Sequence, residues 1–173
     1  ILIQKLSEIN GYEYKGKRYE FSPSSVLKAV DELAGVSLNE GLMVANERIT
    51  NLLLLGISLE ENLEDGTRRS FSFKFIDFEN LQNNDYYVTE EFEVSRANQS
   101  EAQKHRRPDL VLFINGIPIV AIELKKSSVS FENGIKQLEK EQGKDEIPHL
   151  FKYIQLTIAA NGSGARYGTT GTP

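Results

Sequence analysis

Residues 107–125 read RPDLVLFINGIPIVAIELK, and this stretch holds two apolar runs joined by an Asn-Gly pair. Because both runs are continuous and rich in branched side chains, they predict strands that are covered on both faces. The pair Asn115-Gly116 is typical of a hairpin turn. The charged residues stand at the two ends of the stretch, with Asp109 before the first run and Glu123 and Lys125 at the end of the second. A hairpin would bring these ends together.

Two carboxylates at the rim of a buried sheet predict a cation site. An isolated charge that loses its water is costly, so Asp109 and Glu123 need partners. Side by side they also repel each other. A divalent cation relieves both costs, and carboxylate oxygens are ligands that Mg²⁺ prefers.

The pairing register of the hairpin decides whether these side chains meet. A two-residue loop would pair Ile114 with Ile117 and place Asp109 and Glu123 on opposite faces of the sheet. A three-residue loop would pair Phe113 with Ile117 and put both carboxylates on one face. We therefore expect a loop with an odd number of residues.

The same residues carry a resemblance to a known family. Pro108-Asp109, a hairpin and Glu123-x-Lys125 resemble the core motif of the PD-(D/E)xK nuclease superfamily. The longer stretch 107–125 is similar to the N-terminal nuclease domain of the R (restriction and translocation) subunit of type I restriction enzymes. Segments 84–92 and 147–168 agree with this pattern, so the resemblance covers roughly residues 49–168.

The resemblance implies roles for individual residues. Asp109, Glu123 and the Leu124 carbonyl would hold one or two Mg²⁺ ions, for which Mn²⁺ can substitute. Lys125 would orient the attacking water or neutralise charge on the phosphate. Auxiliary or DNA-binding roles are expected for Gln137, Gln142, Lys126 and Arg107.

Two departures from the family pattern stand out. Many relatives place a Tyr four residues after the Gln of the following helix, whereas here Gln137 is followed at that offset by Glu141; Gln142 is the candidate substitute. Relatives also often supply a Glu from the first helix. Here the candidates of suitable size are Gln4 and Glu8, or a carboxylate upstream of Ile1.

The resemblance implies a Mg²⁺-dependent endonuclease that cuts duplex DNA. Its partners would be the methylation and specificity subunits of a restriction complex, and ATP would serve only the full-length parent protein. Two alternatives stay open: a catalytically silent docking or DNA-binding module of the same complex, and a structure-selective repair nuclease.

Composition sets the remaining limits. The 173 residues are 39% hydrophobic, enough for one core. We expect a single nuclease domain over residues 1–168, and a tail over 169–173 that leads towards an absent motor domain. The chain has no cysteine, which excludes disulfides, and no apolar run of membrane-spanning length, so a cytoplasmic location is expected. The net charge of −5 argues mildly against avid DNA binding.

The order of elements predicts an α/β fold with a mixed central sheet flanked by helices, and the resemblance implies the restriction-endonuclease type. Helices are expected over 1–8, 22–33, 39–55 and 131–141. Strands are expected over 71–78, 86–94, 111–114, 117–122 and 153–160. The segment 95–106 is expected to be a polar loop, and the glycine-rich end from residue 161 a loop or linker.

Overall fold

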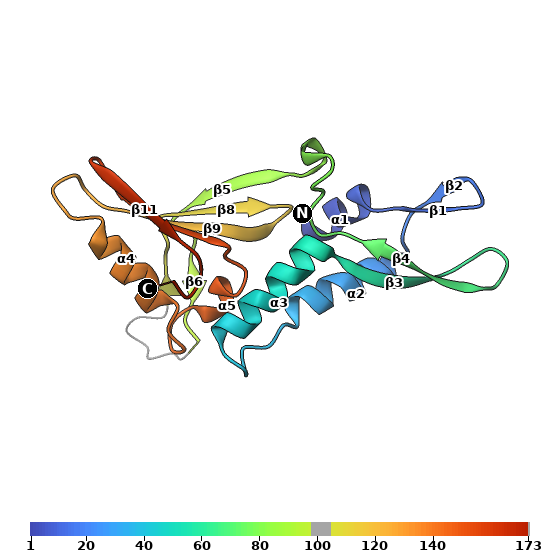
Figure 1. Cartoon of the computed structure of the whole chain (residues 1–173), viewed down its shortest axis with the longest axis horizontal. Helices are drawn as coiled ribbons and strands as arrows, with labels where there is room; N and C mark the ends of the chain where they lie inside the picture. Colours follow the sequence, from blue (N-terminus) through green and yellow to red (C-terminus); the bar gives the residue numbers. More distant parts are fainter. Residues whose placement is uncertain (98–104, 173) are drawn as a thin grey trace.

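A mixed five-stranded sheet forms the centre of the computed structural model (Figure 1), which describes residues 1–97 and 105–172. Its strand order is β11-β10-β9-β8-β5, with β9 and β10 parallel and the other neighbours antiparallel. The bounds are β5 Tyr86–Glu90, β8 Leu110–Ile114, β9 Ile117–Leu124, β10 Leu156–Asn161 and β11 Gly164–Gly168. This arrangement confirms the predicted mixed α/β class.

The β8–β9 hairpin corrects the register prediction. Ile114 pairs with Ile117, so the loop has two residues, and the expectation of an odd loop was wrong. Both loop residues have a positive φ, 56° at Asn115 and 90° at Gly116, as a type I′ turn requires. Asn115 is fully buried, and its side chain donates to the Phe75 carbonyl at 2.9 Å.

A β-bulge restores the shared face that the two-residue turn would have lost. Phe113 pairs with Pro118 but Leu112 pairs with Val120, so Ile119 is an extra residue in β9. The extra residue shifts the remaining pairs by one, and Leu110 faces Ile122. Extending this register by one residue sets Asp109 opposite Glu123.

Helices lie against one face of the central sheet at one end and beyond the hairpin turn at the other (Figure 1). Their bounds are α1 Leu2–Ile9, α2 Pro23–Ala34, α3 Leu42–Leu55, α4 Glu132–Glu141 and α5 Pro148–Phe151, with a 3₁₀ turn at Leu81–Asn83. α4 packs on β9 and β10, and Leu138 is buried there together with Ala121 and Ala159. This core holds α4 over the end of β9.

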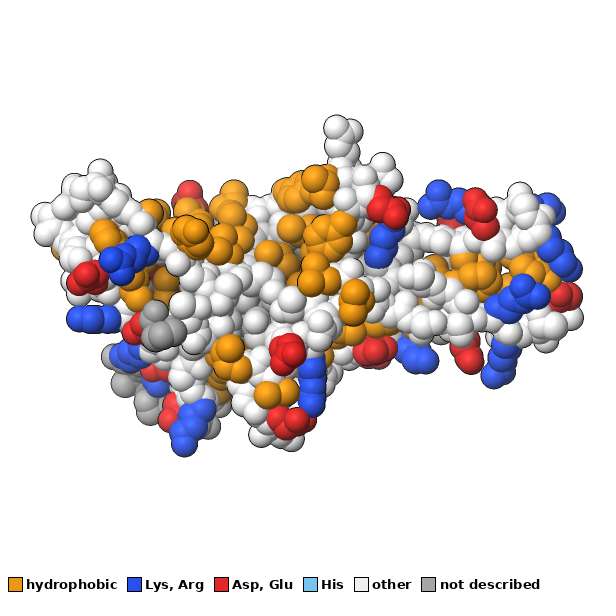
Figure 2. Space-filling view, in the orientation of Figure 1, with side chains coloured by type: hydrophobic (Ala, Val, Ile, Leu, Met, Phe, Trp, Pro, Cys, Tyr) orange, Lys and Arg blue, Asp and Glu red, His pale blue; other side chains and the backbone are white. Residues whose placement is uncertain are grey.

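The opposite face of the sheet is apolar and partly open. Val88 is 61% exposed, and it lines a shallow hollow with Leu112 and Val120. Hydrophobic side chains are visible in Figure 2 where Figure 1 places β5, β8 and β9. No helix of the described residues lies over this face, so the expectation of two covered faces was wrong. Antiparallel pairs such as β5–β8 tolerate one open face.

A second core lies beyond the hairpin turn, among α1, α2, α3 and two small hairpins. Leu6, Ile49, Phe73 and Ile117 are buried in it. The hairpins are β1 Tyr12–Tyr14 with β2 Lys17–Tyr19, and β3 Ile57–Asn62 with β4 Arg68–Phe73; a third, β6 Val94–Ser95 with β7 His105–Arg106, lies next to the central sheet.

Several predicted elements were found with altered bounds. Ser22 caps α2 as expected and accepts a hydrogen bond from the Ser25 amide. Asn39 does not cap α3, which begins after Gly41, a residue whose φ of 98° breaks the helix before Leu42. The expected strand over 71–78 starts and ends earlier, as β4, and β1, β2 and β3 were not predicted.

The glycine-rich end of the chain holds a further strand. β11 pairs antiparallel with β10, with Gly164 opposite Asn161 and Gly168 opposite Thr157, so the expectation of a loop there was wrong. Side-chain contacts from Asn161 to Ser163 and Gly164 close the tight turn between the strands. Residues 98–104 of the expected loop 95–106 lie outside the described residues.

Candidate active site

Asp109 and Glu123 meet at the open end of the β8–β9 hairpin. Asp109 precedes β8 and accepts a hydrogen bond from the Leu124 amide at 2.6 Å through Oδ2. Its own carbonyl accepts from the Glu91 amide at 3.0 Å, which fixes the backbone. Glu123 is only 1% exposed. The bulge at Ile119 thus brings the two predicted carboxylates to one place.

Lys125 joins this pair to helix α4. Its Nζ donates to Glu123 Oε2 at 3.1 Å and to Gln137 Oε1 at 2.8 Å. Gln137 Nε2 in turn donates to Glu141 Oε1 at 3.1 Å. A continuous chain of polar contacts therefore runs from β9 to the end of α4.

A close approach of α4 to the sheet makes these polar contacts possible. A Cβ atom at Gly134 would lie 3.1 Å from the Ala159 Cβ and 3.4 Å from the Glu123 Cβ. The helix therefore rests almost directly on β9 and β10. Gly134, Gln137, Leu138 and Glu141 follow at helical spacing on the side that faces the sheet.

Burial dominates the electrostatics of the site. Loss of water raises the pKa of Glu123 to about 7; the hydrogen bond from Lys125 lowers it, while the charges of Asp109 and Glu141 raise it further. Burial also raises the pKa of Glu141, against the lowering effect of its hydrogen bond from Gln137. Glu123 Oε1 and Glu141 Oε2 are buried and have no hydrogen-bond partner among the described residues.

The donor set at this site fits a hard cation. Glu123 offers a buried carboxylate oxygen without a partner, and Asp109 supplies a second carboxylate. Within residues 1–97 and 105–172, no group of three or more His, Cys, Asp or Glu side chains is arranged to hold a metal ion. Two carboxylates are enough for Mg²⁺, which usually completes its shell with water and phosphate oxygens.

The other predicted residues are not all at the site. Arg107 pairs with Glu93 at 2.8 Å on the surface, close to Asp109 in sequence. Lys126 is exposed directly after Lys125. Gln142 is held elsewhere, because its Oε1 accepts from the Gly171 amide at 2.7 Å and its Nε2 donates to the Leu138 carbonyl.

The first helix contributes no carboxylate to this site. A Cβ at Gly116 would lie 3.5 Å from Leu2, so α1 begins against the hairpin turn. The five residues of β8 separate this turn from Asp109, about 17 Å. Glu8 pairs with Lys5, and Gln4 donates to Glu8, so both candidates are engaged at the far end.

Glu141 is the residue of this cluster that sequence reasoning missed. It was noted as a departure from the family pattern and given no role. Its signal was the offset of four residues from Gln137, which places both side chains on one helix face. Nothing in the sequence marked it as buried, because three of its four nearest neighbours, Glu139, Lys140 and Gln142, are polar.

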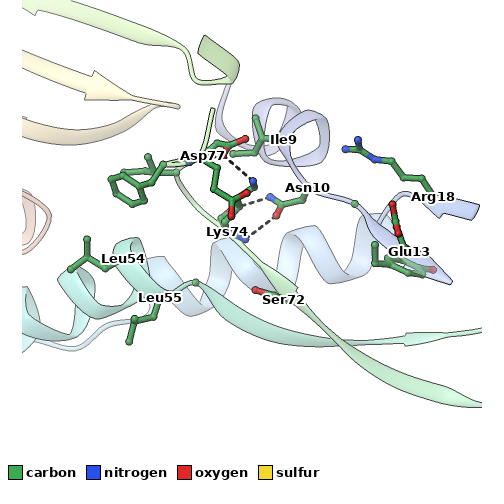
Figure 3. A pocket seen from close by; sticks show the side chains of 15 residues that line it. Ile9, Asn10, Glu13, Arg18, Leu54, Leu55, Ser72, Lys74 and Asp77 are labelled. Carbon is green, nitrogen blue, oxygen red and sulfur yellow. Dashed lines mark hydrogen bonds and ion pairs between the residues drawn. The ribbon is translucent and has the colours of Figure 1, made fainter. Parts of the chain in front are cut away.

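A pocket of about 600 Å³ lies apart from these residues, between α1, α3 and β4. Figure 3 shows that Asn10 and Asp77 both bond to Lys74 inside it. Burial raises the pKa of Asp77, but hydrogen bonds from Asn83 and Lys74 outweigh this effect and bring it to about 2. These polar groups satisfy one another and hold α1 to the chain after β4.

Comparison with known families decides the identity. The family model described as "Type I restriction enzyme R protein N terminus (HSDR_N)" matches residues 1–173, the whole chain. The chain belongs to this family.

Similarity to individual type I restriction enzyme subunits supports this family membership. The chain is 38% identical over 120 residues to the putative MjaIXP endonuclease subunit of Methanocaldococcus jannaschii, which covers 68% of this chain and 11% of the relative. It is 31% identical over 150 residues to the HindI endonuclease subunit of Haemophilus influenzae, and this match covers 85% of this chain and 14% of the relative. The chain therefore spans less than a sixth of these relatives.

Among the helices of residues 1–97 and 105–172, none combines the length and the apolar character that crossing a bilayer requires.

Proposed function

We propose that this chain is a Mg²⁺-dependent endonuclease domain that hydrolyses phosphodiester bonds of duplex DNA. The observation that carries the proposal is the meeting of Asp109, Glu123 and Lys125 at one end of the β8–β9 hairpin, which depends on the bulge at Ile119. The family membership of the chain supports the same reaction.

Asp109, Glu123 and the Leu124 carbonyl would hold the Mg²⁺ or Mn²⁺ ion. When bound, the ion polarises the scissile phosphate and lowers the pKa of a coordinated water. The protein supplies a pair of carboxylates fixed by the backbone: the Leu124 amide orients Asp109, and burial immobilises Glu123.

Lys125 is proposed to act on the attacking water or on the phosphate through its ammonium group. An ammonium group has three N–H donors, and the contacts with Glu123 and Gln137 use two of them. The third donor is available to orient the attacking water or to neutralise charge on the phosphate. Its side chain is 20% exposed, so substrate can reach it.

DNA contacts are proposed for Arg107 and Lys126, and an auxiliary role beside Lys125 is proposed for Gln137. Arg107 is 58% exposed, and its ion pair with the exposed Glu93 contributes little, so a phosphate can replace it. Gln142 is the weakest of the predicted auxiliary residues, because its amide is bound to the end of the chain.

In the parent protein we propose that this segment works with methylation and specificity subunits, which deliver it to DNA. ATP would be hydrolysed by a motor segment outside this chain, and residues 169–173 would lead towards it. The net charge of −5 agrees with delivery by other subunits, since duplex affinity rests largely on basic side chains.

Plasmid nicking in Mg²⁺ tests the proposal. The wild-type chain should convert supercoiled to open-circular DNA, and Asp109→Ala should lose at least about 100-fold in rate, as for removal of a group that stabilises the transition state. Asp31→Ala, an exposed change on α2, is the matched control and should keep full activity. Equal rates for the wild type and Asp109→Ala would contradict the assignment.

A silent docking module is the second candidate. The observation that favours it is the open apolar face around Val88, Leu112 and Val120, because contiguous exposed apolar patches are typical of interaction surfaces. Absence of Mg²⁺-dependent cleavage by the wild-type chain would support this function. A structure-selective repair nuclease would instead show cleavage restricted to branched DNA.

A further inference from the structure

Glu141 occupies a position that the proposed reaction leaves without a role. It ends α4 and is only 1% exposed, as deeply buried as Glu123. Placing a carboxylate there is costly unless it serves an interaction. Its Oε1 accepts a hydrogen bond from Gln137 Nε2 at 3.1 Å, and Oε2 has no partner among the described residues.

The contact with Glu141 determines how the Gln137 amide is oriented. An ionised carboxylate can only accept hydrogen bonds, and an ammonium group can only donate them. Gln137 lies between Glu141 and Lys125, so its NH₂ must face the carboxylate and its oxygen the ammonium. The reversed amide would set donor against donor and acceptor against acceptor.

We propose that Glu141 is a positioning residue: through the Gln137 amide it holds the Lys125 ammonium beside Glu123. The significance for catalysis rests on the proposed nuclease function of Lys125, whereas the positioning itself is a property of the folded chain. Without Glu141, the Gln137 amide is free to rotate away, and Lys125 keeps only its contact with Glu123.

The fold supports this linkage at both ends. Gln137 and Glu141 are four residues apart on α4, one turn of helix, so their side chains lie one above the other. The helix is fixed on the sheet by the close contact of Gly134 with Ala159 and Glu123. The polar contacts therefore join α4 and the end of β9, two elements that are packed against each other.

The experiment observes Lys125 directly by ¹H–¹⁵N spectroscopy of its side-chain ammonium, in the metal-free chain without DNA. The exposed Lys126 ammonium is the internal reference. In the wild type, Lys125 protons should exchange with water more slowly than those of Lys126. Glu141→Leu should reduce this difference, because Lys125 then keeps only its contact with Glu123, and Glu141→Gln, which keeps an acceptor oxygen, should preserve it.

Glu139→Leu is the matched control, because Glu139 is exposed on the same helix and the change removes the same charge. It should leave the Lys125 signal unchanged. Unchanged exchange of Lys125 in Glu141→Leu would overturn the proposal. If that variant does not fold, a wild-type Lys125 that exchanges as fast as Lys126 would overturn it equally.

Cleavage kinetics separate the inference from the proposed function. Glu141→Leu should lower kcat by about 10- to 100-fold with KM unchanged, as for partners that orient a group at a metal site. Glu141→Gln should retain most of kcat. An inactive wild type would contradict the nuclease proposal while the ammonium measurement still decides the role of Glu141.

Discussion

Glu123 is almost fully buried although it carries an ionisable group, and this burial shapes the chemistry of the site. Water is excluded from one carboxylate oxygen, and the other accepts a hydrogen bond from Lys125. A carboxyl group in this setting binds a proton more readily than usual, and a cation would remove the same cost. Either a proton or a metal ion can therefore stabilise this buried carboxyl group.

Glu123 should make the stability of the metal-free chain depend on pH. Its pKa is about 7 in the folded chain against an ordinary value of 4.5, so the folded state holds the proton longer than the unfolded state. Between these values the free energy of unfolding should fall as pH rises, by about 3 kcal/mol in all. Urea denaturation at pH 5 and pH 8 measures this.

Glu123→Gln is the matching variant, because it keeps the shape of the side chain and cannot titrate. The difference in unfolding free energy between the two pH values should shrink in this variant by about 2.5 kcal/mol. An equal pH dependence in the wild type and the variant would show that Glu123 is not the responsible group.

The β8–β9 hairpin shows how one element sets the geometry of the site. Asn115 accepts from the Asp85 amide and donates to Phe75 and Asn84, all at 2.9 Å. These contacts pin the turn, and the bulge at Ile119 then corrects the register by one residue. Turn and bulge act together, since neither alone brings Asp109 opposite Glu123.

Asn115→Ala should destabilise the chain strongly. The change removes three side-chain hydrogen bonds at a buried position and forces alanine into a φ of 56°. We expect a loss of about 3 kcal/mol or more in the free energy of unfolding, measured in urea. Asn115→Gly removes the bonds without the backbone strain and should cost less. Equal losses in both variants would show that strain contributes nothing.

The sequence predicts part of this element and not the rest. The Asn-Gly pair indicates the turn, and the charged ends of residues 107–125 indicate the site. The bulge has no such signal, because Ile119 is one apolar residue within an apolar run. A strand near residue 165 was missed because glycine usually marks loops. Glu141 looked like a solvated charge, and only the closeness of α4 to the sheet buries it.

At the scale of the whole molecule, two cores must be held in one arrangement. The first comprises α1, α2 and α3 with their hairpins, and the second lies under α4 and α5. Side chains bridge them: Asn46 on α3 donates to carbonyls around α5, and the buried Lys152 donates to the Ala34 and Val36 carbonyls at the end of α2. These contacts fix the sheet relative to the helices.

Asn46→Ala should therefore weaken the whole fold. Its side chain donates to the Phe151, Lys152 and Ile154 carbonyls, and each would lose one hydrogen bond, although Thr170 still donates to Phe151 and Ile154. We expect the free energy of unfolding to fall by about 2 kcal/mol, measured by thermal and urea denaturation. Glu47→Ala, an exposed change on the same helix, is the control. No difference between the two variants would argue against a bridge between the cores.

The most direct measurement is a crystal structure of the chain soaked in Mn²⁺, with anomalous data at the manganese edge. The account predicts an anomalous peak about 2.2 Å from carboxylate oxygens of both Asp109 and Glu123, and loss of that peak in Asp109→Ala. A soaked crystal in which Mn²⁺ binds elsewhere, while Asp109 and Glu123 share no ion, would contradict the account.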